Sequence, residues 1–168
     1  LKKLEQFGLD GNALTGPFPA QLGDMLALRE LTASYNDLHG SLPKELGKLT
    51  NLEWLGLSVN TLSGSLPKEL GGCVKLKTLD LDNNAFTGSI NLNTGNDSLT
   101  LSSAGTNTVT VSNAETITGG TQADTITLGA VITAGTIDLG GGADKLTLFN
   151  GTNSVTVSNV ETITGGAS

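Results

Sequence analysis

The sequence is poor in the residues that usually carry catalysis, disulfide bonding and membrane insertion. Its 168 residues include one cysteine, one histidine, one tryptophan and one tyrosine. The lone Cys73 cannot form an internal disulfide, and His39 has no cysteine or serine at a spacing typical of a catalytic pair. No apolar run reaches the roughly 20 residues that a membrane span needs. We therefore expect a non-enzymatic protein without a membrane-spanning segment.

Positive charge is almost absent from the second half of the chain. Residues 1–90 carry eight Lys and Arg residues against ten Asp and Glu, whereas residues 91–168 carry only Lys145 against six acidic residues. Nucleic acids bind proteins through clustered Lys and Arg side chains. A nucleic-acid partner is therefore not expected, while the acidic half is compatible with cations.

The first ninety residues repeat with a period of 24. The units read LKKLEQFGLDGNALTGPFPAQLGD, MLALRELTASYNDLHGSLPKELGK, LTNLEWLGLSVNTLSGSLPKELGG and CVKLKTLDLDNNAFTGSI. Apolar residues recur at unit positions 1, 4, 7, 9 and 14, so Cys73, at position 1, is expected to be a buried small hydrophobe. Asparagine recurs at position 12 (Asn12, Asn36, Asn60, Asn84) and glycine at position 16 (Gly16, Gly40, Gly64, Gly88).

This pattern resembles the plant-type leucine-rich repeat, LxxLxxLxLxxNxLxGxIPxxLGx. The resemblance implies a β-rich solenoid with short parallel strands on a concave side and 3-10 or irregular structure on the convex side. It also implies that the asparagines form a ladder of side-chain hydrogen bonds to backbone groups. One strand is expected in each unit, around Phe7–Leu9, Leu31–Ala33, Leu55–Leu57 and Leu79–Leu81.

The composition changes at about residue 91, where threonine, serine, glycine and asparagine take over. Short runs of alternating polar and apolar residues follow, with apolar centres at Leu99, Val109, Ile117, Ile126, Ile137, Leu146, Val155 and Ile163. Steps near nine residues between β-branched strands are typical of a parallel β-roll. The segment GTNTVTVSNAETITGG (105–120) also recurs as GTNSVTVSNVETITGG (151–166). This regularity argues against disorder.

The second half resembles the secreted RTX repeats, GGxGxDxUx, in a degenerate form. In that family the glycine-rich turn binds Ca²⁺, a cation that takes about 6–8 oxygen ligands. The resemblance implies calcium ligation by Asp97, Asp124, Asp144, Gly119, Gly120 and Gly142. The alternative is that these Asp side chains cap the turns by hydrogen bonds to the backbone.

Two strands per coil would place the turns on alternate edges of the roll. One edge is expected to stack Asn107, Asp124, Asp144 and Glu161, and the other Asp97, Glu115, Gly135 and Asn153. The first edge is the better candidate for a cation ladder, with a calcium ion between the Asp124 and Asp144 turns.

Outward residues on the concave strands are candidates for ligand binding. Large aromatic residues and arginine are enriched at binding hot spots, and concave solenoid faces are extended binding surfaces. The candidates are Tyr35, Trp54, Arg29, Glu53 and Asp80. Ordinary surface decoration is the alternative interpretation.

Threonine pairs flank the apolar centres of the second half. Thr108/Thr110, Thr125/Thr127 and Thr162/Thr164 are expected on one face, interrupted by Lys145/Thr147. Such arrays resemble the ice-binding faces of some β-solenoid antifreeze proteins. Threonine also favours any solvated strand, so this pattern alone leaves both interpretations open.

The sequence thus predicts a two-part solenoid, with leucine-rich repeats over residues 1–90 and an RTX-like parallel β-roll over residues 91–168. The leading functional hypothesis is an extracellular or cell-surface module for binding or adhesion, with a protein or glycan ligand on the concave face and the roll as a calcium-stiffened spacer. The alternatives are a segment of a self-assembling surface-layer or filament protein, whose partners are copies of itself, and an ice-binding protein. The open repeats at both ends suggest a fragment of a longer protein or a chimera.

Overall fold

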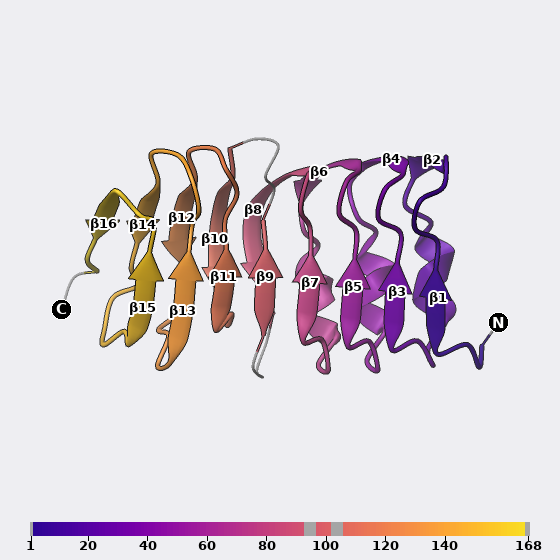
Figure 1. The fold of residues 1–168 in the computed structure, drawn as a ribbon. Coiled ribbons are helices and arrows are strands. Elements are labelled where there is room, and N and C mark those ends of the chain that lie inside the picture. Colours follow the sequence, from indigo (N-terminus) through magenta and orange to yellow (C-terminus); the bar gives the residue numbers. More distant parts are fainter. Residues whose placement is uncertain (1, 93–96, 102–105, 167–168) are drawn as a thin grey trace.

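The chain forms one parallel β-solenoid, as the repeats predicted (Figure 1). The computed structural model describes residues 2–92, 97–101 and 106–166. The first sheet contains β1 (Gln6–Gly8), β3 (Glu30–Thr32), β5 (Trp54–Gly56), β7 (Thr78–Asp80), β9 (Ser98–Thr100), β11 (Thr116–Thr118), β13 (Gly135–Asp138) and β15 (Val155–Ser158). The second contains β2 (Thr15–Pro17), β4 (Asp37–Gly40), β6 (Thr61–Ser65), β8 (Ala85–Asn91), β10 (Thr108–Ser112), β12 (Thr125–Leu128), β14 (Lys145–Thr147) and β16 (Thr162–Thr164).

Both sheets continue without a break where the repeat type changes. In the first sheet β7 pairs with β9 in parallel, with Leu79 opposite Leu99. In the second sheet β8 pairs with β10, with Ile90 opposite Val111. Strand β8 itself crosses the expected change at residue 90. The two kinds of repeat therefore share two sheets and a single hydrophobic core.

The predicted strands of the leucine-rich units are present and begin one residue earlier than expected. Each unit also has a second strand that the repeat pattern did not indicate, namely β2, β4, β6 and β8. These strands complete the second sheet, and they bring the leucine-rich coils into register with the coils of the roll. All eight predicted strands of the roll are present.

One inward position of the roll differs from the prediction. The near-nine step placed the apolar centre of the seventh strand at Val155, but Ile137 of β13 pairs with Val157 of β15, and Val155 lies opposite Gly135. The loop before β15 is longer than its neighbours, so the fixed step fails there by two residues. Because the side-chain period of a strand is two, this shift keeps valine on the inward side.

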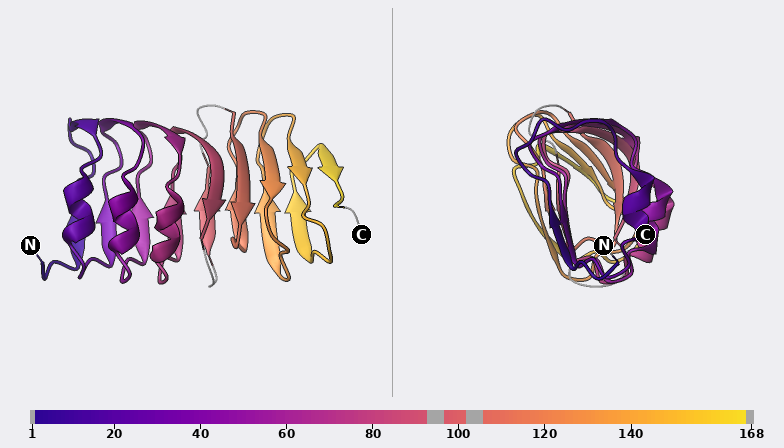
Figure 2. Two further views of the ribbon diagram at one scale, coloured as in Figure 1. Left: turned by 180° about the vertical axis from the view of Figure 1, so that it is seen from behind. Right: turned by 90° about the vertical axis from the view of Figure 1, so that its right-hand side faces the viewer.

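The core is a column of apolar side chains, one set per coil, enclosed between the two sheets. Leu31, Leu55, Leu79, Leu99 and Ile117 are fully buried one behind another along the first sheet. No coil can bury its own apolar side without a neighbour, so stability comes from stacking. Viewed along the solenoid, the successive coils nearly overlay (Figure 2).

Three 3-10 helices confirm the expected convex side of the leucine-rich half. They are η1 (Ala20–Asp24), η2 (Lys44–Lys48) and η3 (Lys68–Gly72). They form a column alongside the second sheet in this half only (Figure 2). No described residue after η3 forms such a helix, so β8 is the last strand of the second sheet with a 3-10 helix packed beside it.

The asparagine ladder that the resemblance implied is present. The Nδ2 of Asn60 donates to the carbonyls of Ala33, Leu57 and Ser58 at 2.9–3.2 Å, and its Oδ1 accepts from the Leu38 amide at 3.0 Å. Asn36 and Asn84 repeat this pattern in the neighbouring coils. The ladder satisfies buried backbone groups that the sheets leave unpaired.

Candidate functional site

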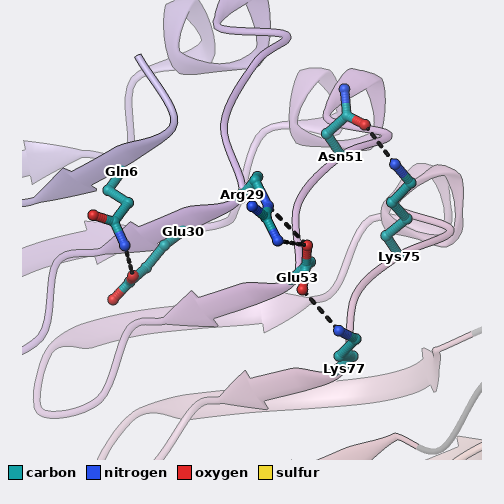
Figure 3. A network of polar contacts seen from close by, with 7 residues as sticks. All are labelled: Gln6, Arg29, Glu30, Asn51, Glu53, Lys75 and Lys77. Carbon is teal, nitrogen blue, oxygen red and sulfur yellow. Dashed lines mark hydrogen bonds and ion pairs between the residues drawn. The ribbon is translucent and has the colours of Figure 1, made fainter.

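A ladder of charged side chains crosses the outer surface of the first sheet in the leucine-rich half (Figure 3). The Nε and Nη2 of Arg29 donate to Oε1 of Glu53 at 2.8 and 2.6 Å. The Nζ of Lys77 donates to Oε2 of the same carboxylate at 2.7 Å. Hydrogen bonds from Lys77 and then Arg29 lower the pKa of Glu53 to about 2. These three residues occupy equivalent positions in successive units, so the 24-residue period itself brings them together.

A groove beside this ladder is the first candidate site. Its volume is about 580 Å³, and it is lined by Lys3, Leu4, Glu5, Gln6, Arg29, Glu30, Glu53 and Trp54. The groove contains three of the five ligand-binding candidates of the sequence, Arg29, Glu53 and Trp54. Trp54 is 48% exposed there.

The other two candidates lie outside the groove. Tyr35 is 64% exposed in the turn after β3, where it adopts a left-handed backbone conformation with φ of 57°. Asp80 ends β7, and its Oδ1 accepts a hydrogen bond from the Asp82 amide at 3.1 Å. Sequence position alone could not tell which of the five candidates line the groove, because all five occupy outward or turn positions of the repeat.

The second candidate site is a double row of hydroxyl side chains on the second sheet from β8 onward. Five consecutive strands each place two outward residues in register. One row contains Thr87, Thr108, Thr125, Lys145 and Thr162, and the other contains Ser89, Thr110, Thr127, Thr147 and Thr164. Between the rows over β8, β10 and β12 runs a trough of about 380 Å³. The sequence predicted the rows on β10 to β16, and the structure extends them to β8.

A similar double row on the first sheet was not predicted. One row contains Thr78, Ser98, Thr116, Thr136 and Thr156, and the other contains Asp80, Thr100, Thr118, Asp138 and Ser158. The TIT and TID runs at 116–118 and 136–138 were visible in the sequence. The assumed two-strand coil already implied a second face, but the outward residues of that face were not recognised as an array.

The edge turns stack in the predicted order and bond to one another through carboxylates. The Asn107 amide donates to Oδ1 of Asp124 at 2.8 Å, and the Asp124 amide donates to Oδ1 of Asp144 at 2.6 Å. The Asp144 amide donates to Oε2 of Glu161 at 2.6 Å. Each carboxylate thus accepts a backbone N–H from the preceding coil, as in a turn cap.

These contacts leave little room for the calcium ion suggested by the resemblance. Both oxygens of Asp124 are engaged, since Oδ2 also accepts from the Gly120 amide at 3.1 Å. Among the described residues of this edge, one buried carboxylate oxygen, Oδ2 of Asp144, has no hydrogen-bond partner. Calcium takes about 6–8 oxygen ligands, so this one oxygen supplies a small part of the set.

The glycines of this edge are also used in contacts between turns. Gly119 and Gly142 lie so close to the neighbouring turn that a Cβ atom at either would overlap its backbone. Among the described residues no three acidic, His or Cys side chains form a group that could hold a metal ion. The carboxylates of this edge therefore act as turn caps in the structure, and calcium binding stays a prediction.

Asp97 departs from this pattern at the change of repeat type. Its side chain is 2% exposed, and both carboxylate oxygens lack a hydrogen-bond partner among the described residues. By analogy with the other edge, the backbone amide of Lys77 in the preceding coil would be the donor to the Asp97 carboxylate. This amide donates to the Glu53 carbonyl at 2.9 Å. Burial and, to a lesser degree, the nearby Glu115 carboxylate raise the pKa of Asp97 to about 6.

Cys73 is fully buried, as its repeat position predicted. Its Sγ donates to the Leu46 carbonyl at 3.2 Å. Burial raises the pKa of the thiol to about 11. The side chain therefore acts as a small core residue. In the part of the chain that the structure covers, no helix is long and apolar enough to cross a membrane.

Comparison with known proteins agrees with this architecture. The Leucine Rich Repeat family model matches residues 27–49, 51–73 and 75–96. No curated protein matches the sequence. Among solved structures, the BIR3–SERK2 complex from Arabidopsis thaliana contains a chain that is 30% identical, with a TM-score of 0.54, and the match covers 66% of this chain and 60% of that one.

Two further solved structures show the same fold over nearly the whole length of this chain. A plant ice-binding protein matches at 21% identity and a TM-score of 0.66, covering 95% of this chain and 58% of its own. The ectodomain of the Arabidopsis thaliana receptor kinase GASSHO1/SCHENGEN3 matches at 20% identity and a TM-score of 0.55, covering 98% of this chain and 27% of its own. The chain therefore spans less than two thirds of each of these proteins. The match to the Leucine Rich Repeat model lies within residues 27–96, and the coils beyond them extend the same parallel solenoid.

Proposed function

We propose that the chain is a non-enzymatic, extracellular binding protein, and that the double row on the second sheet binds the surface of ice. The observation that carries the proposal is the in-register array on β8, β10, β12, β14 and β16. Nine of its ten outward residues are serine or threonine, and the exception is Lys145.

The array has the regularity that a crystalline ligand demands. Neighbouring strands lie about 4.8 Å apart, and alternate residues along a strand repeat about every 6.6 Å. Threonine is β-branched and stiff about χ1, so its methyl and hydroxyl groups hold fixed positions on a strand. Such a surface can hold water in an ordered layer that joins an ice lattice. A flat array also requires an untwisted sheet, which the stacking of solenoid coils favours.

The comparisons support this proposal through the fold. The plant ice-binding protein shares the fold along 95% of this chain. At 21% identity this likeness concerns the fold alone, so the hydroxyl rows of this chain carry the functional argument. An extracellular location is part of the proposal, because the GASSHO1/SCHENGEN3 match is an ectodomain.

Ice-affinity partitioning and an ice-recrystallisation assay test the proposal. We expect the wild-type protein to concentrate in slowly grown ice and to keep small ice crystals from coarsening. Thr110→Tyr places a bulky ring in the middle of the array and should abolish most of both effects. Thr118→Tyr is the matched control, because it makes the same change on the opposite sheet. Exclusion of the wild type from ice, or equal loss in both variants, refutes the proposal.

The groove at Trp54 favours a second candidate function, recognition of a protein or glycan by the leucine-rich half. This groove combines an exposed aromatic side chain with charged and amide side chains from β1, β3 and β5 and their flanking residues. It lies on the other sheet from the proposed ice-binding array, so both functions could reside in one chain. Loss of a partner's affinity in Trp54→Ala, with ice adsorption unchanged, is the expected result.

A further inference from the structure

The indole of Trp54 lies over a glycine in the middle of the first sheet. A Cβ atom at Gly56 would stand 3.2 Å from the Trp54 Nε1 and 3.2 Å from the Thr32 Cγ2. Glycine at this position therefore lets the ring lie along the sheet beside Thr32. Since the residue remains 48% exposed, the indole offers an accessible aromatic surface at the edge of the groove.

The polar side chains around this ring are already bonded to one another. The Nε2 of Gln6 donates to Oε2 of Glu30 at 2.9 Å, and Arg29 and Lys77 share the carboxylate of Glu53 (Figure 3). These contacts hold the side chains in place before any ligand arrives, which reduces the entropy lost on binding. They also pair the two cations with an anion, so the groove does not present a field of one sign.

A neutral ligand rich in hydroxyl groups suits this combination best. A pyranose ring has a face of C–H groups that packs on an aromatic ring, and its hydroxyls both donate to carboxylates and accept from amides. A strongly charged peptide would have to compete with the existing ion pairs. The groove volume of about 580 Å³ is in the range of small-ligand sites.

We propose that this groove binds a neutral glycan, with a sugar ring on Trp54 and sugar hydroxyls bonded to Gln6, Glu30 and Glu53. The inference rests on the second candidate function above and specifies its ligand class. It is independent of ice binding, which uses the other sheet.

Fluorescence gives a direct test because Trp54 is the single tryptophan of the chain. The probes are cellohexaose, laminarihexaose and mannohexaose, titrated to millimolar concentration. We expect at least one to shift the emission to shorter wavelength and to protect the indole from acrylamide quenching, with a saturable heat in calorimetry. Trp54→Ala should remove the heat, and Trp54→Phe should keep part of it. Thr118→Ala, on the same sheet outside the groove, should bind like the wild type.

Charged probes separate the possible failures. Hexalysine and hexaglutamate are titrated in the same way. Protection by one of these peptides and by none of the glycans overturns the glycan inference while keeping the groove as a recognition site. No protection by any probe, or a glycan heat that survives Trp54→Ala, overturns the groove as the site. Unchanged melting temperatures of the variants show that loss of binding is not loss of folding.

Discussion

Replacement of the orphan carboxylate, Asp97→Asn, should stabilise the protein at neutral and alkaline pH. Asp97 is 2% exposed, and both its oxygens are buried without a hydrogen-bond partner in the part of the chain that the structure describes. The amide that would serve it, Lys77 N–H, bonds to the Glu53 carbonyl of the leucine-rich coil before it. An asparagine of the same shape removes the buried charge, and its Nδ2 can donate to the nearby Glu115.

The sign and size of the effect follow from linkage. The folded-state pKa of Asp97 is raised from 3.8 to about 6, so the folded protein binds this proton more tightly than the unfolded chain. The resulting stability is fully present below about pH 3.8 and is lost as pH rises through about 6. Roughly 1.36 kcal/mol per pKa unit makes the loss about 3 kcal/mol at most. Solvent relaxation around the carboxylate reduces it, so we expect a gain of about 1–3 kcal/mol in Asp97→Asn at pH 8.

Thermal unfolding from pH 3.5 to 8 measures this difference. At about 2–4 °C per kcal/mol for a chain of this size, Asp97→Asn should melt several degrees above the wild type at pH 8 and match it near pH 3.5. The matched control is Asp124→Asn, because Asp124 is equally buried but accepts three N–H groups. Loss of the Asp124 carboxylate in this variant should destabilise the protein by about 1–3 kcal/mol.

The result that refutes the reasoning is a melting curve for Asp97→Asn that follows that of the wild type across this pH range. A lower melting temperature at pH 8 would also refute it, since it would mean that the carboxylate has a favourable partner. Repeating the series in EDTA keeps adventitious cations from supplying that partner.

Three further outcomes follow from the same contacts. Asn60→Ala removes the hydrogen bonds that Asn60 donates to three carbonyls and the one that it accepts from the Leu38 amide. Urea unfolding should show a loss of about 2–4 kcal/mol in the free energy of unfolding. The control Asn12→Ala, at the exposed end of the same ladder, should lower this free energy much less. Millimolar calcium should leave the melting temperature where EDTA leaves it, because backbone amides occupy both oxygens of Asp124; a rise of several degrees would restore the calcium hypothesis. Cys73 should react with a thiol reagent only after unfolding, because burial raises its pKa to about 11, and rapid labelling of the native protein would contradict its place in the core.

Much of the fold could be predicted because each coil repeats a local rule. Inward apolar residues such as Leu55 and Ile126 follow from the spacing of the strands, and the Asn36 and Asn60 ladder follows from the repeat period. The edge order of Asn107, Asp124, Asp144 and Glu161 also followed from assuming two strands per coil. The fixed step failed only at Val155, where a longer loop shifts the register.

The functional surfaces were less accessible to such reasoning. Arg29, Glu53 and Trp54 were identified as outward residues, but their grouping in one groove, apart from Tyr35 and Asp80, depends on how side chains from three coils settle. The hydroxyl rows of the first sheet were missed, although the assumed two-strand coil already implied a second face. The calcium hypothesis rested on the resemblance to RTX turns, whereas one of the two backbone amides that occupy Asp124, that of Asn107, belongs to another coil.

By itself the sequence determined the period of the coils, the inward side of each strand and the threonine-rich outer positions, since a strand alternates its side chains whatever lies beside it. The tertiary structure decided which strands are neighbours: it added a second strand to each leucine-rich unit, joined both halves into two continuous sheets, and gave Asp97 no donor among the described residues. The physical reason is that the hydrogen-bond partners of a strand lie a whole coil away in the sequence. The register between coils therefore determines which residues pair, which the alternation within one strand does not.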